Sequence, residues 1–329
     1  MKYVESPCPE CGSPGTLLYD GVRDYYFGFP GQWRFLVCTS SKCNIAWLYP
    51  PPDDSTLRAA YSKYYTHDLR LGSKWKAGLR VRLFRFLGKE YIRRSTDALQ
   101  RLPMFGRLIE DALLESGTIQ PRRQGTILDI GCGRGDRLDL FSSVGWGRAI
   151  GVEPDFEAAK TGLALGRDIR VAAAESVPVD ANTASAAMMY HVIEHVRKPK
   201  VALREALRIL EPGIGKLVVI TPNIESAMRH RWGRYWRGFE APRHLTIFTV
   251  RALKTALLAA GFEIESARTS ARSAAWIEAA SAAASGIGSK QLSTRKRFAT
   301  ANRLFRQQAD SIARGLPIGD EIVVIARKP

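Results

Sequence analysis

The chain has 329 residues, of which 45% are hydrophobic and 25% are charged, as is ordinary for a globular protein with a sizeable core. Its 49 Lys and Arg outnumber 32 Asp and Glu, which leaves a net charge of +17. Such a charge attracts nucleic acid, anionic membrane surfaces or phosphorylated substrates, but it says nothing about the fold.

Targeting signals and membrane spans are not expected. Residues 1–8 contain no apolar core and no cleavage site, and no run of 18 apolar residues exists. We therefore expect a cytoplasmic protein, with peripheral contact to the inner membrane face left open. Because the cytoplasm is reducing, the five cysteines are candidates for metal binding or packing rather than for disulfides.

Residues 1–50 carry two pairs of cysteines and are rich in Gly, Pro and aromatic residues. A segment this small lacks the volume for its own core, which is typical of a metal-stapled β module. Four thiolates satisfy a tetrahedral Zn²⁺ and leave no open position for catalysis. The sequence predicts a structural zinc site, with free thiols as the alternative. Its ligands are Cys8, Cys11, Cys38 and Cys43.

Residues 51–120 are expected to form a basic helical linker or lid. Residues 58–107 include 13 Lys and Arg against 3 Asp and Glu. In residues 74–94, apolar and basic side chains occupy separate helical faces. This pattern suits packing on the rest of the chain, the commoner use, or an interfacial membrane helix. Membrane contact through residues 74–94 is therefore the second interpretation.

From residue 121 onward, short apolar runs alternate with helical segments, which predicts a parallel sheet with helices on both faces. The expected fold is a Rossmann-like, doubly wound α/β domain over residues 121–329, with a helical insertion at about residues 270–316 before the last strand. The predicted strands are 126–130, 149–152, 169–172, 184–190, 216–221, 262–267 and 321–326, and the predicted helices are 135–143, 155–165 and 198–210.

A glycine-rich turn follows the first of these strands. Gly131, Gly133 and Gly135 let the backbone approach a ligand where a Cβ would collide. Asp136 stands where a dinucleotide fingerprint has its third glycine, so a nucleoside-plus-amino-acid ligand is favoured over a pyrophosphate. Glu153 ends the next strand, where a carboxylate accepts both ribose hydroxyls. The pattern predicts a nucleoside-type cofactor site.

Residues 126–268 resemble the class I S-adenosylmethionine-dependent methyltransferases, in the branch of ubiquinone-biosynthesis O-methyltransferases and sugar methyltransferases. The matching motifs are residues 128–135, 174–178, 191–196, 210–213, 221–223, 242–245 and 261–262. The resemblance implies S-adenosylmethionine as cofactor and methyl transfer to O or C of a small acceptor. That acceptor would be sugar-like, anionic or lipid-linked.

The resemblance also implies cofactor contacts. The acid before the turn and its first two glycines would line the methionine part, Glu153 would hold the ribose, and an Ala–Glu pair would border the adenine. Ala173 departs from the family, where many relatives have an Asp that bonds the adenine amine. Adenine recognition is therefore expected to depend on backbone groups. The implied residues are Asp129, Gly131, Cys132, Gly133, Glu153, Ala174, Glu175 and Tyr190.

Two histidines are candidates for the base that a hydroxyl or acidic C–H acceptor requires. His244 comes first, because segment 221–249 is too long for an ordinary connection. Its His-Leu pair, followed by an aromatic and a hydroxyl residue, is similar to the base motif of sugar C-methyltransferases. Anchoring of the loop is the alternative role. His191 comes second, with walling off the cofactor as its alternative.

Segment 191–196 also contains a Glu-His pair, Glu194-His195, which resembles a divalent-metal pair of some relatives; helix capping is its commoner role. Segment 221–249 carries five arginines interleaved with aromatic residues, which would suit a phosphorylated, nucleotide-linked or lipid-linked substrate. A solvated, partly packed loop is the alternative. The arginines are Arg229, Arg231, Arg234, Arg237 and Arg243.

Two rival functions remain open. A zinc-bearing RNA methyltransferase would fit the charge, although an Asn-Pro-Pro-Tyr-like motif is absent after the fourth strand. A non-catalytic binding protein that kept the fold is supported only by Ala173 and by Ser185-Ala186, which replace common family residues. Nucleic acid is therefore the less favoured partner, and a small-molecule substrate the preferred one.

Overall fold

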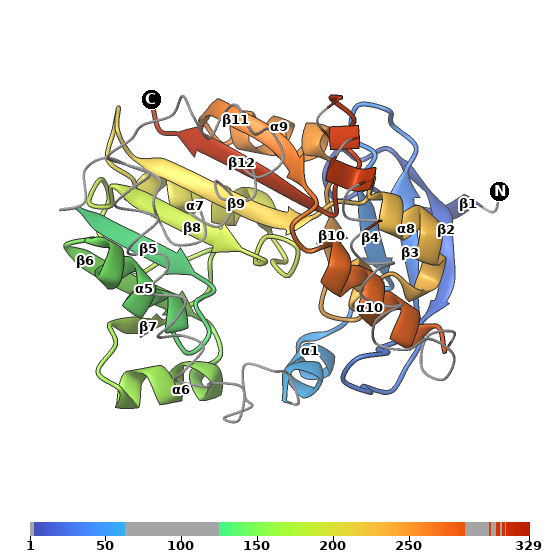
Figure 1. The fold of residues 1–329 in the computed structure, drawn as a ribbon, viewed down its shortest axis with the longest axis horizontal. Coiled ribbons are helices and arrows are strands. Elements are labelled where there is room, and N and C mark those ends of the chain that lie inside the picture. The colour runs from blue at the N-terminus through green and yellow to red at the C-terminus, as the bar shows by residue number, and fades with distance from the viewer. Residues whose placement is uncertain (1–2, 63–124, 287–302, 304–306, 310, 313) are drawn as a thin grey trace.

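The structure is a computed structural model that describes residues 3–62, 125–286, 303, 307–309, 311–312 and 314–329. The basic segment 74–94 and part of the expected helical insertion lie outside the described residues. No helix of the described part is long and apolar enough to cross a membrane. Figure 1 shows a larger sheet beside a smaller one that contains the N-terminal strands. Helix α1 (Asp54–Tyr61) is drawn below them, between the two sheets.

The larger sheet has seven strands in the order β11-β12-β9-β8-β5-β6-β7. Strand β12 runs antiparallel to both neighbours, and the pairs from β9 to β7 are parallel. The predicted Rossmann-like α/β domain is therefore confirmed, with a mixed sheet. Its strands are β5 (Thr126–Ile130), β6 (Arg148–Glu153), β7 (Ile169–Val171), β8 (Ala186–Tyr190), β9 (Lys216–Pro222), β11 (Glu263–Ser270) and β12 (Glu321–Arg327).

Helices cover both faces of this sheet because successive strand residues point to opposite sides. Met188 packs in the core cluster that contains residues of α5 and α6, whereas Met189 packs with residues of α7 and α9. The same alternation along every central strand explains the continuous apolar runs of the sequence. The helices are α5 (Asp136–Val144), α6 (Phe156–Ala164), α7 (Pro199–Ile209) and α9 (Val250–Ala259).

The smaller sheet has five antiparallel strands in the order β1-β2-β3-β4-β10. Four come from the N-terminal fifty residues, and the fifth comes from the distant segment that follows His244. The N-terminal module is therefore completed by a strand of the α/β part. Its strands are β1 (Tyr3–Pro7), β2 (Pro14–Val22), β3 (Trp33–Cys38), β4 (Ala46–Tyr49) and β10 (Thr246–Ile247).

Both faces of the smaller sheet are covered by other parts of the chain. Leu36 and Trp47 belong to the core cluster of α7 and α9, while Phe35 and Leu48 pack with segment 224–247 and α10. The module thus has no separate core, as its size predicts. The elements that cover the face of Phe35 and Leu48 include α8 (Ala227–Trp232), α10 (Ala274–Ala284) and the 3-10 helices η3 (Gly233–Tyr235) and η4 (Arg237–Phe239).

Candidate functional site

The glycine turn joins β5 to α5 at the carboxyl edge of the larger sheet. Gly131 has φ +74° and Gly135 has φ +79°, a region that L side chains avoid. A Cβ on Gly131 would lie 2.4 Å from Cγ2 of Val192. The amides of Gly131 and Cys132 donate to the carbonyl of Val152 at 2.7 and 3.1 Å. The turn is therefore tied to β6, and no side chain fits at its first position.

Asp129 is a fully buried carboxylate just before this turn. Its Oδ2 accepts a hydrogen bond from Nε of Arg137 at 3.0 Å, while Oδ1 has no hydrogen-bond partner among the described residues. Burial raises the pKa of Asp129, and the Arg137 charge opposes that rise. Because a buried acceptor without a donor is costly, Oδ1 marks a place where a ligand donor, such as an ammonium group, would bind.

Glu153 ends β6 next to the turn. Its Oε2 accepts the amide of Gly133 at 2.8 Å, and its Oε1 accepts the amide of Asp155 at 3.0 Å. Burial raises the pKa of Glu153, and these two backbone N–H groups counteract it. Each oxygen keeps a second lone pair, so the carboxylate can still accept two hydroxyls. The structure thus brings Glu153 beside the glycine turn, at the same edge as Asp129.

The other residues of the predicted cofactor set differ in exposure. Ala174 is buried and Glu175 is half-buried, both in the turn after β7. Cys132 has its Sγ in the core, where a Cβ on Gly151 would come within 2.5 Å of it. Burial raises the pKa of the Cys132 thiol. The side chain of Cys132 packs beneath the turn, so its backbone is the part that could contact a cofactor, and its place in the cofactor set stays a prediction.

Tyr190 ends β8 between two arginines that the sequence did not single out. The guanidinium of Arg137 lies over the ring, 4.5 Å from its centroid, and Arg272 donates to the Tyr190 hydroxyl at 2.7 Å. No local signal marks Arg272, because it reaches the site from the loop after β11. Together these side chains form the cationic and aromatic border of the site.

His191 lies between two buried carboxylates. Its Nδ1 is 3.1 Å from Oε1 of Glu194, and its Nε2 is 3.0 Å from Oε1 of Glu321. Burial lowers the pKa of His191, but the two carboxylates outweigh it and raise the pKa to about 9. At neutral pH the ring therefore donates from both nitrogens and has no lone pair for a proton. This geometry argues against His191 as the base and favours its alternative role as a wall.

The His191 imidazolium predicts a pH dependence of stability. Its folded-state pKa of about 9 exceeds the ordinary 6.5, so its stabilisation is complete below about pH 6.5 and is lost as pH rises through about 9. We expect the stability advantage of wild type over His191→Gln, measured by urea unfolding, to shrink between pH 7 and 10. The exposed His230 supplies the control, since His230→Gln should follow wild type. A constant advantage across this range would contradict the assignment.

His244 is buried in the segment between η4 and β10. Its Nδ1 donates to the carbonyl of Gly238 at 2.7 Å, which leaves the lone pair on Nε2. Burial lowers the pKa of His244 well below its ordinary value, and the neighbouring His195 adds to this effect. The ring packs edge-on against His195 with centroids 4.6 Å apart. His244 is therefore neutral at pH 7 and oriented by the backbone.

Glu194 and His195 lie close to His244. Nδ1 of His195 is 2.9 Å from the hydroxyl of Tyr61 and 3.1 Å from the carbonyl of Arg243. One ligand atom from each of Glu194, His195 and His244 lies within 4.8 Å of the other two. The donor types of this cluster suit a divalent metal. Tyr61 was missed because it follows no motif and reaches His195 only through folding.

The four cysteines come together at one end of the smaller sheet. The Sγ atoms of Cys8 and Cys43 are 3.7 Å apart, those of Cys11 and Cys38 are 3.4 Å apart, and all four lie within 4.8 Å of one another. A zinc ion with tetrahedral Zn–S bonds separates its sulfurs by about 3.8 Å. The donor set and spacing therefore fit structural zinc.

The expected phosphate-binding arginines are largely engaged within the protein. Three of the five pair with carboxylates of this chain, and the neighbouring aromatics Trp236 and Phe239 are buried against the smaller sheet. The partly packed alternative therefore describes this segment better than an open anion-binding loop. The pairs are Arg231–Glu278, Arg237–Glu240 and Arg243–Asp24.

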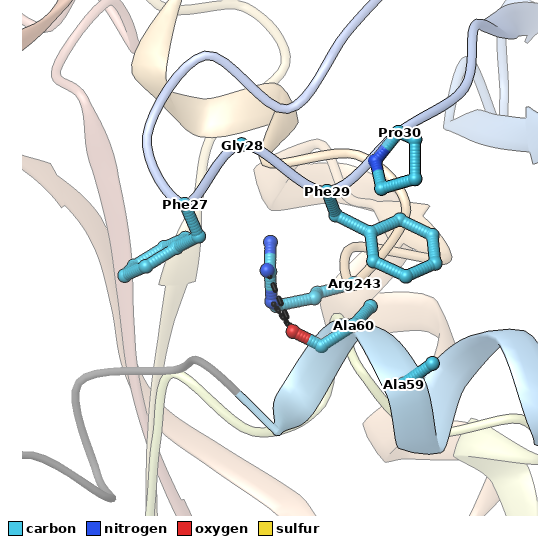
Figure 2. Close-up of a pocket in the computed structure, with 7 residues that line it drawn as sticks. All are labelled: Phe27, Gly28, Phe29, Pro30, Ala59, Ala60 and Arg243. Atoms are coloured by element: carbon cyan, nitrogen blue, oxygen red, sulfur yellow. Dashed lines mark hydrogen bonds between the residues drawn. The ribbon is translucent and has the colours of Figure 1, made fainter.

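A cavity of about 170 Å³ lies where the N-terminal module meets α1. Figure 2 shows the guanidinium of Arg243 between loop 27–30 and the end of α1. The cavity is lined mainly by apolar atoms of that loop, Ala59 and Ala60. Because Arg243 precedes His244, this cavity adjoins the segment that carries the histidine.

Most of the larger sheet, with the glycine turn, lies in a segment that matches a known protein family. A family model described as a methyltransferase domain matches residues 99–267, more than half of the chain. The protein belongs to this family, which confirms the resemblance at the level of methyltransferases. The particular branch stays a prediction.

Three of the solved structures to which this chain is similar contain methyltransferases. A Thermotoga maritima protein described as a SAM-dependent methyltransferase is 20% identical, with 76% of this chain and 100% of that chain covered and a TM-score of 0.45. A Haloferax volcanii putative methyltransferase, in complex with the Trm112 activator, is 18% identical over 71% and 99% with a TM-score of 0.47. The geranyl diphosphate C-methyltransferase of Streptomyces coelicolor is 16% identical over 68% and 79% with a TM-score of 0.45. Among curated proteins, none matches.

Proposed function

We propose that this protein is an S-adenosylmethionine-dependent methyltransferase that methylates O or C of a small, sugar-like, anionic or lipid-linked metabolite. The observation that carries the proposal is the buried Oδ1 of Asp129, which lacks a donor directly beside the glycine turn of a methyltransferase-family sheet. A cofactor ammonium group would satisfy that oxygen. The four cysteines are proposed to hold a structural Zn²⁺ that takes no part in catalysis.

The residues at the sheet edge fit the cofactor. Asp129 would bind its ammonium group, and Glu153 would accept hydrogen bonds from its ribose hydroxyls. Because the glycines of the turn carry no side chains, the cofactor could lie close to the backbone there. Bound S-adenosylmethionine supplies an electrophilic methyl group. Positioning of the acceptor behind that methyl contributes much of the rate in such reactions.

His244 is proposed to take the proton of the acceptor. Its Nδ1 is fixed on the carbonyl of Gly238, so Nε2 is the atom that accepts. Burial keeps the pKa of His244 low, and the ring is therefore ready as a neutral base at pH 7. Oε2 of Glu240 lies 3.9 Å from Nε2 and would stabilise the imidazolium as it forms.

The test uses methyl-labelled S-adenosylmethionine and a cell extract that is afterwards separated into RNA, lipid and small-molecule fractions. We expect His244→Ala to lower transfer by about 10²–10⁴-fold, the usual contribution of a positioned base. Its affinity for S-adenosylhomocysteine, measured by calorimetry, should stay at the wild-type value. The control is His230→Ala, an exposed histidine of α8, which should transfer at the wild-type rate.

The fractions distinguish the rival functions. Label in small molecules or lipid-linked sugars that disappears in His244→Ala supports the proposal. Label in RNA would replace it with an RNA methyltransferase, and a chain that binds no cofactor would be a non-catalytic member of the fold.

A further inference from the structure

Arg243, the residue before His244, forms an ion pair with the N-terminal module. Nη2 of Arg243 lies 2.9 Å from Oδ2 of Asp24, and both side chains are 0% exposed. The same Nη2 donates to the carbonyl of Ala60 at 2.7 Å, and the guanidinium lies 4.5 Å from the ring centroid of Phe27. Figure 2 shows this guanidinium seated between the module loop and α1.

Asp24 is a preorganised anchor. Its Oδ1 accepts the amides of Tyr26 and Phe27 at 3.1 and 2.9 Å, and its Oδ2 accepts the amide of Phe29 at 3.2 Å. The loop of the module therefore fixes the carboxylate by itself, independently of Arg243. Because three backbone N–H groups fix the carboxylate, its remaining acceptor position binds the guanidinium in one geometry only.

The anchored residue is joined to both histidines. The carbonyl of Arg243 is 3.1 Å from Nδ1 of His195, and the next residue in the chain is His244. On the far side, the carbonyl of Leu245 accepts the amide of Leu48 at 3.0 Å, just before β10 pairs with β4. The module thus contacts residues 243–245, the histidine segment, on both sides of His244.

Stability alone does not account for such a pair. Two buried charges lose about as much in desolvation as they gain from each other, and an apolar pair of similar volume often does as well or better. A buried ion pair does, however, impose one arrangement on the segments it joins. The Asp24–Arg243 pair lies beside His195, His244 and the cavity where the N-terminal module meets α1. The arrangement that it imposes is therefore that of the segment with the proposed base.

We propose that Asp24 is a positioning residue for methyl transfer, which through Arg243 holds His244 and His195 in place for the acceptor. This inference rests on the proposed function and extends it, because it makes the cysteine-bearing module a working part of the active site. Asp24 itself touches neither the cofactor turn nor either histidine.

The test is Asp24→Asn, which keeps the shape of the side chain and removes its charge. We expect kcat for methyl transfer to fall about 10²-fold, the usual cost of a misplacement of about 1 Å, with an unchanged KM for S-adenosylmethionine. Asp24→Glu, which restores the carboxylate, should recover part of the rate. The control is Asp20→Asn, which removes an exposed carboxylate paired with Arg34 on the same sheet and should leave the rate unchanged.

Folding is monitored by thermal unfolding and by calorimetric binding of S-adenosylhomocysteine. If Asp24→Asn fails to fold, Asp24→Asn combined with Arg243→Gln removes both buried charges and should fold again without recovering transfer. Folded Asp24→Asn with wild-type kcat, or a double variant that regains full transfer, would overturn the positioning role alone. A wild-type protein that binds no cofactor would overturn the proposed function itself.

Discussion

Gly131→Ala is expected to lower the affinity for S-adenosylhomocysteine about 10²-fold while the chain stays folded. The residue has φ +74°, and an added Cβ would lie 2.4 Å from Cγ2 of Val192. Strain of this kind costs about 1–3 kcal/mol, and every 1.4 kcal/mol is tenfold in binding. To relieve the clash, the turn must move away from Val192, which changes its position relative to Asp129 and Glu153. Calorimetric titration measures the loss.

The matched control is Gly166→Ala. Gly166 has φ +76°, almost the same backbone conformation, but no other part of the described chain lies within 4 Å of the position that an added Cβ would take. It should show a similar backbone penalty in urea unfolding and the wild-type affinity for S-adenosylhomocysteine. Equal loss of affinity in both variants would show that general destabilisation, and not the turn, is responsible. Wild-type affinity in Gly131→Ala would remove the turn from the cofactor site.

Cys38→Ser is expected to abolish stoichiometric zinc and to destabilise the whole protein by several kcal/mol. A structural zinc site contributes on the order of 10 kcal/mol in small zinc-finger peptides. Here Cys8, Cys38 and Cys43 belong to the core cluster that includes α7 and α9. The loops that carry the cysteines are also tied to these helices, since Lys200 donates to the carbonyl of Glu10 at 2.7 Å and Thr249 donates to that of Cys43 at 3.1 Å.

Zinc content by elemental analysis and the midpoint of urea unfolding test this expectation. Cys132→Ala is the control, because it truncates a buried cysteine far from the cluster in sequence and should retain one zinc per chain. A wild-type protein that carries no zinc, and whose unfolding midpoint zinc does not change, would leave the four cysteines as free thiols.

Local pattern was sufficient for much of this molecule. The apolar runs and their spacing predicted the strands of the larger sheet, because burial on both faces requires continuous apolar residues. The glycine turn and Glu153 could be paired from sequence, since neighbouring parallel strands end at one edge. The cysteine spacing likewise predicted four sulfurs in one place, and the structure brings them within 4.8 Å.

Roles that depend on a distant partner could not be predicted in the same way. His191 had the sequence context of a base, but its second carboxylate, Glu321, comes from the last strand and holds the ring protonated. Segment 221–249 has the arginine-rich composition of an anion-binding loop. Arg243, however, already forms an ion pair with Asp24 of the N-terminal module. In both cases the partner lies far away in the sequence.

The sequence by itself determined the α/β class, the glycine turn with its acidic neighbour and the cysteine cluster, because each arises from residues whose spacing alone carries the constraint. Only the tertiary structure decided that β10 completes the N-terminal sheet, that His191 is charged while His244 is neutral, and that Asp24 reaches the histidine segment. The physical reason is that the protonation state and orientation of a buried side chain depend on which charges folding places against it, and local spacing does not encode those neighbours.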